Sequence, residues 1–350
     1  MQEQPHPPYS AAIVGPGFIG AGDQISGDAL GQQVKNLDGT HSAALAGHPS
    51  IRLVAGSSRD PGRRDRFQQR TGLRAYADWR EMLDREKLDI VSIATYAPVH
   101  AEIVRECARR GVKAVYCEKP IATRIADADE MVSACAQSGS LLAINHNRRF
   151  NPNYRRLRDL VAAGDLGDLT SVSLRWSSGR LGNIGTHLID ATVMLTGRSV
   201  QAVSATLDLS AKPDCRGPQF HDPGGWGVMR FEGGLMAVVD AANHAIGKQQ
   251  IILYGTKGRA ITGRDEVDLE FWDGRRDHWP STRQQATSMD RAVADIVAWL
   301  DGDAPFPYPA DQAARTLEVI LAFHASHARG AAWVDLPLTA EDRARELKTG

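Results

Sequence analysis

The chain has 350 residues, of which 42% are hydrophobic, and this length favours about two domains of about 150 residues each. Its 41 Lys and Arg residues stand against 42 Asp and Glu residues, a net charge of −1. No excess of positive charge is available for a phosphate backbone, so nucleic acid is not an expected partner. No apolar run approaches the roughly 18 residues that a membrane-spanning helix requires, and we expect a soluble protein that does not enter a membrane.

The amino-terminal stretch and the cysteines favour a cytoplasmic protein. Residues 1–10 are polar and proline-rich, without the basic start and apolar stretch of a secretory signal. The four cysteines (Cys107, Cys117, Cys135 and Cys215) are far apart and form no C-x-x-C pair, which argues against a zinc site or a disulfide framework. We expect reduced thiols and no bound metal.

The first part of the chain alternates short apolar runs with amphipathic stretches, a pattern typical of a parallel sheet covered by helices. Val99, Ile103, Val104 and Cys107 recur at helical spacing before Gly111 and predict a crossover helix. We therefore predict an α/β fold with a doubly wound parallel sheet of Rossmann type over residues 9–145. The candidate buried strands are 11–14, 51–56, 89–94, 112–117 and 141–145.

The pattern changes after about residue 151, where strand-like runs follow one another with few helices between them. This half, 146–340, predicts an α/β domain with a large, mostly antiparallel open sheet. Gly233-Gly234 predicts a hairpin, and Thr287 with Asp290 predicts a capping box for a helix that ends at Gly302. A last long helix is expected over 311–329. The candidate strands are 169–176, 201–209, 226–231, 235–241 and 249–254.

A G-x-G-x-x-G motif at 15–20 directly follows the first strand, the context in which glycines let the backbone approach a pyrophosphate. An ordinary glycine turn is the alternative. The next strand ends at Ser57-Ser58-Arg59, far beyond the roughly 20 residues expected between the glycine motif and the ribose-binding position. We therefore expect an inserted segment over 21–40, which would cover the phosphates, contact a partner subunit or form a surface loop. Because Ser58 and Arg59 stand where a carboxylate would select NAD(H), the residues favour NADP(H) over NAD(H).

Three further segments sharpen this interpretation. They are T-Y-A-P-V-H at 95–100, E-K-P at 118–120 and G-T-H-L-I-D at 185–190. In this order, together with L-Y-G-T-K-G at 253–258, they resemble the Gfo/Idh/MocA oxidoreductases, named for glucose-fructose oxidoreductase and inositol dehydrogenase. The resemblance implies a Rossmann domain, a substrate domain whose open sheet forms a homodimer or homotetramer interface, and hydride transfer between a nicotinamide and a sugar, polyol or cyclitol carbon.

Residue by residue, Lys119 matches the family's active-site lysine, His187 its histidine near the reacting hydroxyl and Asp190 the acidic residue after it. His187 is the better candidate for moving the proton, and Lys119 for holding the substrate oxygen, although the two roles could be exchanged. The alternatives are an exposed Glu118–Lys119 ion pair, a structural histidine, and an Asp190 that stabilises a helix dipole. Asn183 stands where many family members have an aspartate, and its amide cannot accept a proton.

The resemblance and the residue types together predict the contacts of both ligands. Arg148-Arg149 with Arg155-Arg156 would bind an acidic or nucleotide-linked sugar or form a solvated helix face, and the His324–His327 pair is expected to be structural. The cofactor residues are Gly15, Gly17, Phe18, Ile19, Gly20, Ser57, Ser58, Arg59, Thr95, Tyr96, Pro98, His100, Glu118 and Lys119. The substrate residues are Asn145, Arg149, Asn151, Tyr154, Trp176, Asn183 and Thr186.

We therefore expect a cytoplasmic, NADP(H)-preferring sugar or polyol oxidoreductase. Two alternatives stay open at this point. One is a glycoside hydrolase that uses the nicotinamide for transient oxidation, and the other is a non-catalytic protein that senses a nucleotide. Lys119 and His187 argue against the second alternative.

Overall fold

The computed structural model describes residues 9–210 and 217–349. The contacts divide the chain into two compact units. The first unit contains the chain up to residue 121 with 127–145 and 286–310, and the second contains 122–126, 146–285 and the residues from 311 onward. Residues 286–310 thus belong to the first unit although 146–285 separate them from the rest of it in the sequence. The functional domains at 9–145 and 146–340 stay a prediction.

The first unit is built around a six-stranded sheet with the order β3-β2-β1-β4-β5-β6. Every neighbouring pair is parallel, and the strand order changes direction at β1, as in a doubly wound dinucleotide-binding sheet. Every residue of β4, β5 and β6 is buried. The predicted fold class is confirmed for this half. The strands are β1 (Tyr9–Val14), β2 (Ile51–Ser57), β3 (Arg74–Tyr76), β4 (Ile90–Ile93), β5 (Ala114–Cys117) and β6 (Leu141–Ile144).

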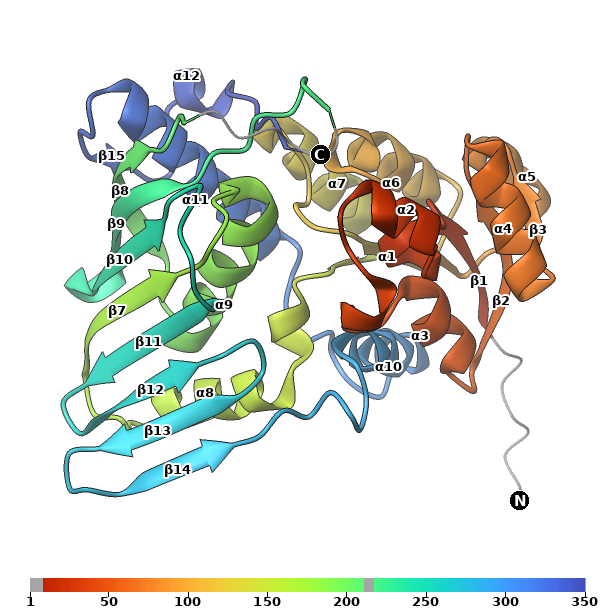
Figure 1. Ribbon diagram of the computed structural model, residues 1–350. Helices are drawn as coiled ribbons and strands as arrows, with labels where there is room; N and C mark the ends of the chain where they lie inside the picture. Colours follow the sequence, from red (N-terminus) through yellow and green to blue (C-terminus); the bar gives the residue numbers. More distant parts are fainter. Residues whose placement is uncertain (1–8, 211–216, 350) are drawn as a thin grey trace. The chain divides into compact units, whose positions relative to one another are not determined.

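Helices connect these strands (Figure 1). The predicted crossover helix is α6, which buries Ile103, Val104 and Cys107. Gly111 follows with a φ of +73°, a left-handed conformation that favours glycine after a helix. The helical segments are α1 (Phe18–Ala21), α2 (Gln24–Ala29), η1 (Val34–Asn36), α3 (His41–Gly47), α4 (Pro61–Thr71), α5 (Trp79–Arg85), η2 (Ala97–Val99), α6 (His100–Arg109), α7 (Ile125–Ser138) and α10 (Ser288–Asp301).

The segment 21–40, predicted as an insertion, is folded onto the first unit. It contains α2 and η1, and α3 begins after it with the Thr40 hydroxyl as its cap. Asp23 is only 1% exposed, and its carboxylate accepts two hydrogen bonds of 2.7 Å from the Arg66 guanidinium on α4. A buried ion pair therefore holds the start of this segment against the rest of the unit.

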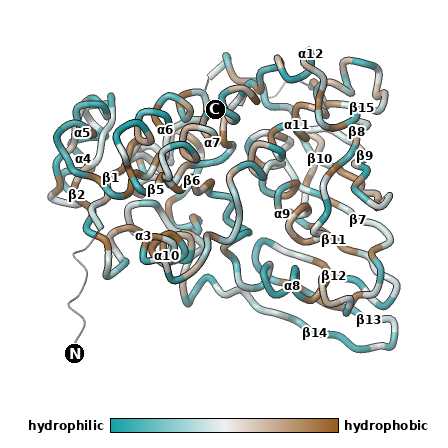
Figure 2. The backbone as a smooth tube through the Cα atoms, turned by 180° about the vertical axis from the view of Figure 1, so that it is seen from behind, coloured by the Kyte–Doolittle hydropathy of each residue, from teal (hydrophilic) through white to brown (hydrophobic). Residues whose placement is uncertain are grey.

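The helix α10 packs against α3 (Figure 1), although the two helices are far apart in the sequence. The predicted capping box of Thr287 and Asp290 is confirmed, and the helix ends at Gly302 with a φ of +78°. The Ser288 backbone N–H donates to the Asp38 carboxylate at 3.2 Å, which ties α10 to the segment 21–40. Both helices carry hydrophobic stretches (Figure 2), so their contact buries apolar surface.

The second unit contains a nine-stranded sheet with the order β14-β13-β12-β11-β7-β10-β9-β8-β15. Among the described strands of this second sheet, only β7 and β10 form a parallel pair, so the predicted mostly antiparallel sheet is confirmed. The predicted hairpin joins β9 to β10 through Gly233 and Gly234, both at positive φ. The strands are β7 (Leu169–Arg175), β8 (Val200–Leu207), β9 (Gly225–Phe231), β10 (Met236–Ala241), β11 (Gln250–Gly255), β12 (Gly258–Thr262), β13 (Val267–Phe271), β14 (Arg276–Trp279) and β15 (Val334–Asp335).

Three helices pack on one face of this sheet: α11 contacts β8, α9 contacts β11 and α8 contacts β13 (Figure 1). On the opposite face of β9 and β10, Trp226 and Val238 are 47% and 53% exposed. The sheet thus has one covered and one open face within the described part of the chain. The remaining helical segments are η3 (Asn147–Phe150), α8 (Pro152–Ala162), η4 (Leu181–Gly185), α9 (Thr186–Thr196), η5 (Glu232–Gly234), α11 (Asp311–Ala328) and α12 (Ala340–Arg343).

The cysteines that the structure describes are buried free thiols. They are Cys107, Cys117 and Cys135, and burial raises the pKa of each thiol, which keeps them protonated and unreactive. Cys215 lies outside the described residues. Across residues 9–210 and 217–349, no helix combines the length and the apolar character needed to cross a membrane.

Candidate active site

The predicted glycine motif forms a tight turn directly after β1. Gly15 has a φ of +90°, and a Cβ there would lie 2.8 Å from the Ala94 carbonyl oxygen. A Cβ on Gly20 would lie 2.1 Å from the Gly15 carbonyl oxygen, so both positions require glycine. The Gly15 N–H donates to the Ser57 carbonyl oxygen at 2.9 Å. The turn thus has the strand–turn–helix geometry of a dinucleotide-binding motif, with α1 shortened to 4 residues.

The segment after β2 presents arginines, and the carboxylate nearest to the strand end caps a helix. Ser58 is buried, and Arg59 beside it is exposed. The first carboxylate after the strand, Asp60, caps α4 and accepts a hydrogen bond of 2.7 Å from the Arg63 N–H. Arg64 Nη1 donates to the Ser58 carbonyl oxygen at 2.7 Å. The local charge is therefore positive where a ribose-binding acid would stand.

Thr95 and His100 follow β4 and differ in the hydrogen-bonding atoms that they leave available for a ligand. The Thr95 hydroxyl oxygen is buried and has no hydrogen-bond partner among the described residues. His100 is fully buried, and its Nδ1 lies 3.1 Å from the carbonyl oxygens of both Pro120 and Ile121. Burial lowers the pKa of His100. The ring thus links the backbone after β4 to the backbone after β5, and cofactor contact by this residue stays a prediction.

Glu118 and Lys119 directly follow β5, and groups inside the unit bind the Glu118 carboxylate. His41 Nε2 lies 2.9 Å from Glu118 Oε1, Asn145 Nδ2 donates to the same oxygen at 2.7 Å, and the Lys119 backbone N–H donates to Oε2 at 3.2 Å. Burial raises the pKa of Glu118, but the His41 hydrogen bond and the other donors outweigh burial and hold it at about 2. Glu118 is ionised and buried, so the alternative of an exposed ion pair is wrong for this residue.

These residues fit a nicotinamide dinucleotide. The glycine turn is a backbone cradle that any Cβ would fill. The Thr95 hydroxyl and the Asn145 Oδ1 are buried polar atoms without a hydrogen-bond partner among the described residues, and both lie at the carboxyl ends of strands, where such ligands bind. The other predicted cofactor residues lie in the same region: Gly17 in the turn, Phe18 and Ile19 in α1, Tyr96 before η2 and Pro98 in η2.

In the second unit, Asp190 is the centre of a buried charged cluster. Arg149 donates to it through Nε at 2.8 Å and through Nη2 at 2.9 Å. His146 Nδ1 lies 3.3 Å from the same carboxylate, and His146 Nε2 lies 3.0 Å from the Thr186 hydroxyl. The first turn of α9 carries no acidic residue, so the helix-dipole interpretation of Asp190 is wrong. The solvated-face interpretation is also wrong for Arg149, which is buried.

Asn183 lies in η4, a π-helical turn that leads into α9 and His187. The Asp222 carboxylate accepts hydrogen bonds from the Gly182 N–H at 2.8 Å and the Asn183 N–H at 2.9 Å, and the Thr349 hydroxyl donates to it at 2.9 Å. Burial raises the pKa of Asp222, opposed first by the Gly182 hydrogen bond. A buried carboxylate therefore fixes the backbone of the turn that carries Asn183.

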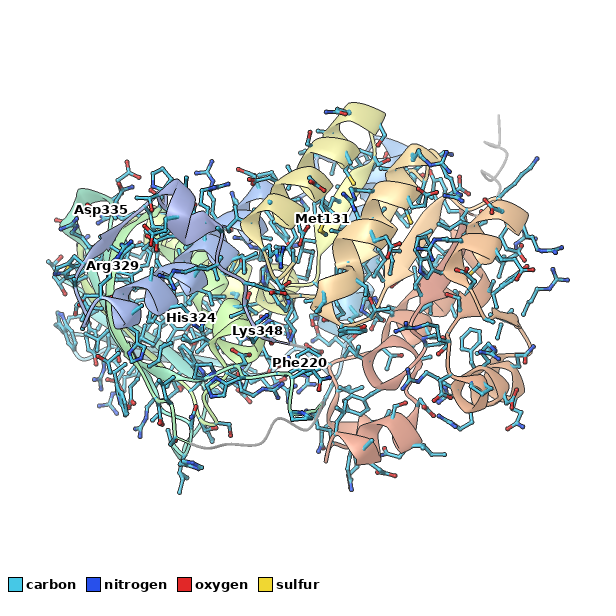
Figure 3. The ribbon with its side chains drawn as sticks, turned by 90° about the horizontal axis from the view of Figure 1, so that it is seen from above. Met131, Phe220, His324, Arg329, Asp335 and Lys348 are labelled. Atoms are coloured by element: carbon cyan, nitrogen blue, oxygen red, sulfur yellow. The ribbon has the colours of Figure 1, made fainter. Side chains whose placement is uncertain are left out.

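The segment 345–349 packs against the same turn. The His221 N–H donates to the Lys348 carbonyl oxygen at 2.9 Å, and Figure 3 labels Lys348 and the neighbouring Phe220 on these two segments. A Cβ on Gly182 would lie 2.5 Å from the Leu347 side chain. This segment thus covers one side of the turn.

His187 is the second residue of α9 and is partly exposed. Its ring centroid lies 6.0 Å from that of His146, with the two rings edge to face. His146 in turn contacts Asp190, so the predicted histidine and the predicted acid lie on one helix beside a second histidine. The catalytic roles of His187, Asp190 and Asn183 stay predictions.

Three predicted sugar contacts have their polar atoms bonded within the second unit. The Asn151 side chain caps α8, the Tyr154 hydroxyl donates to the Gly263 carbonyl oxygen at 3.0 Å, and the Trp176 indole N–H donates to the Gly179 carbonyl oxygen at 2.8 Å. These bonds give each residue a structural role. Contact with a sugar stays a prediction for all of them.

Comparison with known proteins assigns the family. Residues 10–146 match the model of an oxidoreductase family with an NAD-binding Rossmann fold, and residues 154–261 match the GFO/IDH/MocA C-terminal domain. The chain belongs to the GFO/IDH/MocA oxidoreductase family. The resemblance carried by the three sequence segments is thereby confirmed.

The curated relatives of this GFO/IDH/MocA protein include sugar and cyclitol dehydrogenases. Myo-inositol 2-dehydrogenase of Thermotoga maritima is 28% identical over 201 residues, 53% of this chain and 60% of that protein. D-apiose dehydrogenase of Paraburkholderia graminis is 36% identical over 134 residues, 38% of this chain and 32% of that protein. The matches thus span three fifths or less of these relatives.

Solved structures share the fold. The crystal structure of aldose-aldose oxidoreductase from Caulobacter crescentus superposes with a TM-score of 0.77 at 22% identity, covering 94% of this chain and 100% of that chain. The likeness therefore extends over both sheets.

Three residues of these two clusters, one in the first unit and two in the second, were not singled out from the sequence: His41, His146 and Asp222. His41 begins α3, and nothing in the sequence pattern indicates its contact with Glu118. His146 directly follows Asn145, a predicted contact, and adjacency was the available signal. Asp222 lies in a glycine-rich stretch with no periodicity. All three are recognised only through contacts between distant segments.

Proposed function

We propose that this protein is an NADP(H)-preferring oxidoreductase that transfers a hydride between the nicotinamide and a hydroxyl or keto carbon of a sugar, polyol or cyclitol in the cytoplasm. The observation that carries the proposal is the glycine turn after β1, where the Gly15 and Gly20 positions exclude any Cβ. Family membership and the names of the dehydrogenase relatives support the class of reaction and substrate.

The residues of the chain would divide the chemistry as follows. A bound nicotinamide supplies the hydride donor or acceptor. His187 takes the hydroxyl proton in oxidation or returns it in reduction, because imidazole titrates near neutral pH. Lys119 holds the substrate oxygen and stabilises the negative charge that develops on it. Asn183 holds a substrate hydroxyl without accepting its proton.

The arginines after β2 support the cofactor preference. Arg59 is exposed, and a Cβ on Gly17 would lie 3.4 Å from the Arg63 guanidinium carbon, so positive charge lies next to both the strand end and the glycine turn. A 2′-phosphate gains charge-assisted hydrogen bonds from such groups. We expect tighter binding of NADPH than of NADH, and Arg59→Ala should weaken NADPH binding by about tenfold with little effect on NADH. Equal affinities of the two cofactors in a fluorescence titration would reject the preference.

The decisive test of the reaction is Lys119→Ala. Turnover with the best sugar or cyclitol should fall by about 100-fold or more, while cofactor binding stays nearly unchanged. An unaltered turnover would show that the lysine is misassigned. Sugar cleavage without net reduction of the cofactor would instead indicate the glycoside hydrolase alternative.

The open face of the second sheet supports association of copies into a homodimer or homotetramer. Trp226 and Val238 leave an apolar patch on that face, and exposed apolar patches commonly mark interfaces. Light scattering should give a mass of two or four chains, and the Trp226→Asp, Val238→Asp double variant should give a lower mass. A monomeric wild-type protein would contradict this.

A further inference from the structure

A buried chain of polar groups ends at Glu118, whose carboxylate accepts a hydrogen bond from the Lys119 backbone N–H, and the roles assigned above leave this chain unused. The Ser92 hydroxyl lies 2.5 Å from His41 Nδ1, and His41 Nε2 lies 2.9 Å from Glu118 Oε1. The three residues come from β4, α3 and the end of β5, and all are buried. A buried imidazole between a hydroxyl and a carboxylate requires an explanation, because burying polar groups is costly unless each is hydrogen-bonded.

The hydrogen bonds indicate which ring nitrogen of His41 donates and which accepts. The Ser92 hydroxyl can donate to His41 Nδ1, which leaves the Nε2–H to donate to Glu118. The His41 ring also lies against the Tyr116 ring, with centroids 4.7 Å apart, so its orientation is held by packing as well as by bonds.

Three titratable neighbours of Glu118 stay uncharged at neutral pH. Burial raises the pKa of Tyr116 and of Cys117, both on β5, and burial lowers the pKa of His100 on α6. Asn145, after β6, adds a neutral donor. The charge of Glu118 is therefore modified only by His41 and by Lys119 among these groups.

We propose that His41 is a positioning residue for Lys119: its ring holds the Glu118 carboxylate charged and fixed behind the lysine, so that Lys119 stays an ammonium ion. The inference rests on the proposed function and deepens it. A fixed opposite charge nearby favours the charged form of an amine. Lys119 then binds the substrate oxygen as a cation, and the proton transfer falls to His187. Of the two roles that the sequence leaves exchangeable, this arrangement favours oxygen binding for Lys119 and proton transfer for His187.

The test measures the titration of the Lys119 amine directly, by NMR of the protein labelled with ¹³C-lysine, with Lys119→Met identifying the signal. In His41→Leu the amine should titrate lower by about one pH unit, and Glu118→Gln should lower it at least as much. His41→Gln, whose amide can donate to Glu118, should restore the wild-type value. The matched control is His48→Leu, the same change at the other end of α3, which should leave the titration unchanged.

Two results would overturn the proposal. One is a Lys119 titration in His41→Leu that matches the His48→Leu control. The other is an unchanged Lys119 titration in Glu118→Gln. This second result decides the question if His41→Leu does not fold. The measurement needs no turnover, so a protein that oxidises no sugar would defeat the proposed function and leave this test intact.

Discussion

Each unit buries one carboxylate beside its predicted catalytic residue, and the two carboxylates differ in the groups that bind them. The Asp190 carboxylate is bound in bidentate fashion by the guanidinium of Arg149, a permanent cation. Glu118 is bound by an imidazole, a side-chain amide and a backbone N–H. Both carboxylates are nearly inaccessible to solvent, so burial alone does not distinguish them.

The difference in partners decides what each carboxylate can do. The Asp190 charge is cancelled within its own ion pair, which fixes α9 and leaves little charge for a neighbour. The Glu118 charge is not cancelled by a permanent cation, so it acts on Lys119. Similar burial is thus combined with a permanent cation as partner in one unit and with partners that are not permanent cations in the other.

The largest expected effect tests the structural side of this comparison. Arg149→Leu leaves Asp190 buried and without its guanidinium partner, and breaking a buried pair in this way costs about 3–5 kcal/mol of unfolding free energy. Urea unfolding measures it. Arg158→Leu, an exposed arginine on the same stretch of chain, should change the unfolding free energy by about 0.5 kcal/mol or less. Similar losses in both variants would contradict the comparison.

A smaller effect is expected from Glu118→Gln, about 1–3 kcal/mol at neutral pH, since the amide keeps the shape but loses charge-assisted bonds. The sign of its pH dependence follows from the lowered pKa of Glu118, about 2 in the folded chain. The wild-type contribution is present above the ordinary glutamate pKa and is lost as the pH falls towards about 2. Unfolding free energies measured from neutral to acid pH should therefore converge for the two proteins, and a constant difference would show that Glu118 is not ionised as described.

The smallest effect concerns Asp222, a third buried carboxylate bound by backbone N–H groups and the Thr349 hydroxyl. Thr349→Val removes one of these bonds at nearly constant volume and should cost about 0.5–1.5 kcal/mol in urea unfolding. Because burial raises the pKa of Asp222, the charged form is the one that needs the hydroxyl. The difference should shrink in acid, as the carboxyl becomes protonated, and a difference that grows in acid would be against this assignment.

Local patterns predicted much of the fold. The apolar runs of the first half, the hairpin at Gly233-Gly234 and the capping box at Thr287 are all present in the structure, because each is specified by residues a few positions apart. The short β3 and β15 and the strands from β12 to β14 were missed. Strands of two or three residues carry too little periodicity, and β12 to β14 are defined mainly by their neighbours in the sheet.

The site was predictable to a similar degree. The glycine turn and the position of Glu118–Lys119 at a strand end follow from sequence motifs, and the structure places both as expected. The burial of Arg149 against Asp190, 41 positions apart, does not follow from any motif. Its sequence neighbours suggested a solvated helix face instead.

The amino-acid sequence by itself determined the two kinds of sheet, the glycine turn and the family. Hydrophobic period, glycine spacing and short motifs are local properties, so they can be recognised in the sequence without the fold. Only the tertiary structure decided that α10 packs with α3, that His41 meets Glu118, and that Asp222 fixes the turn before His187. These pairings join distant segments, and their energies come from burial and hydrogen bonding that exist only once the chain has folded.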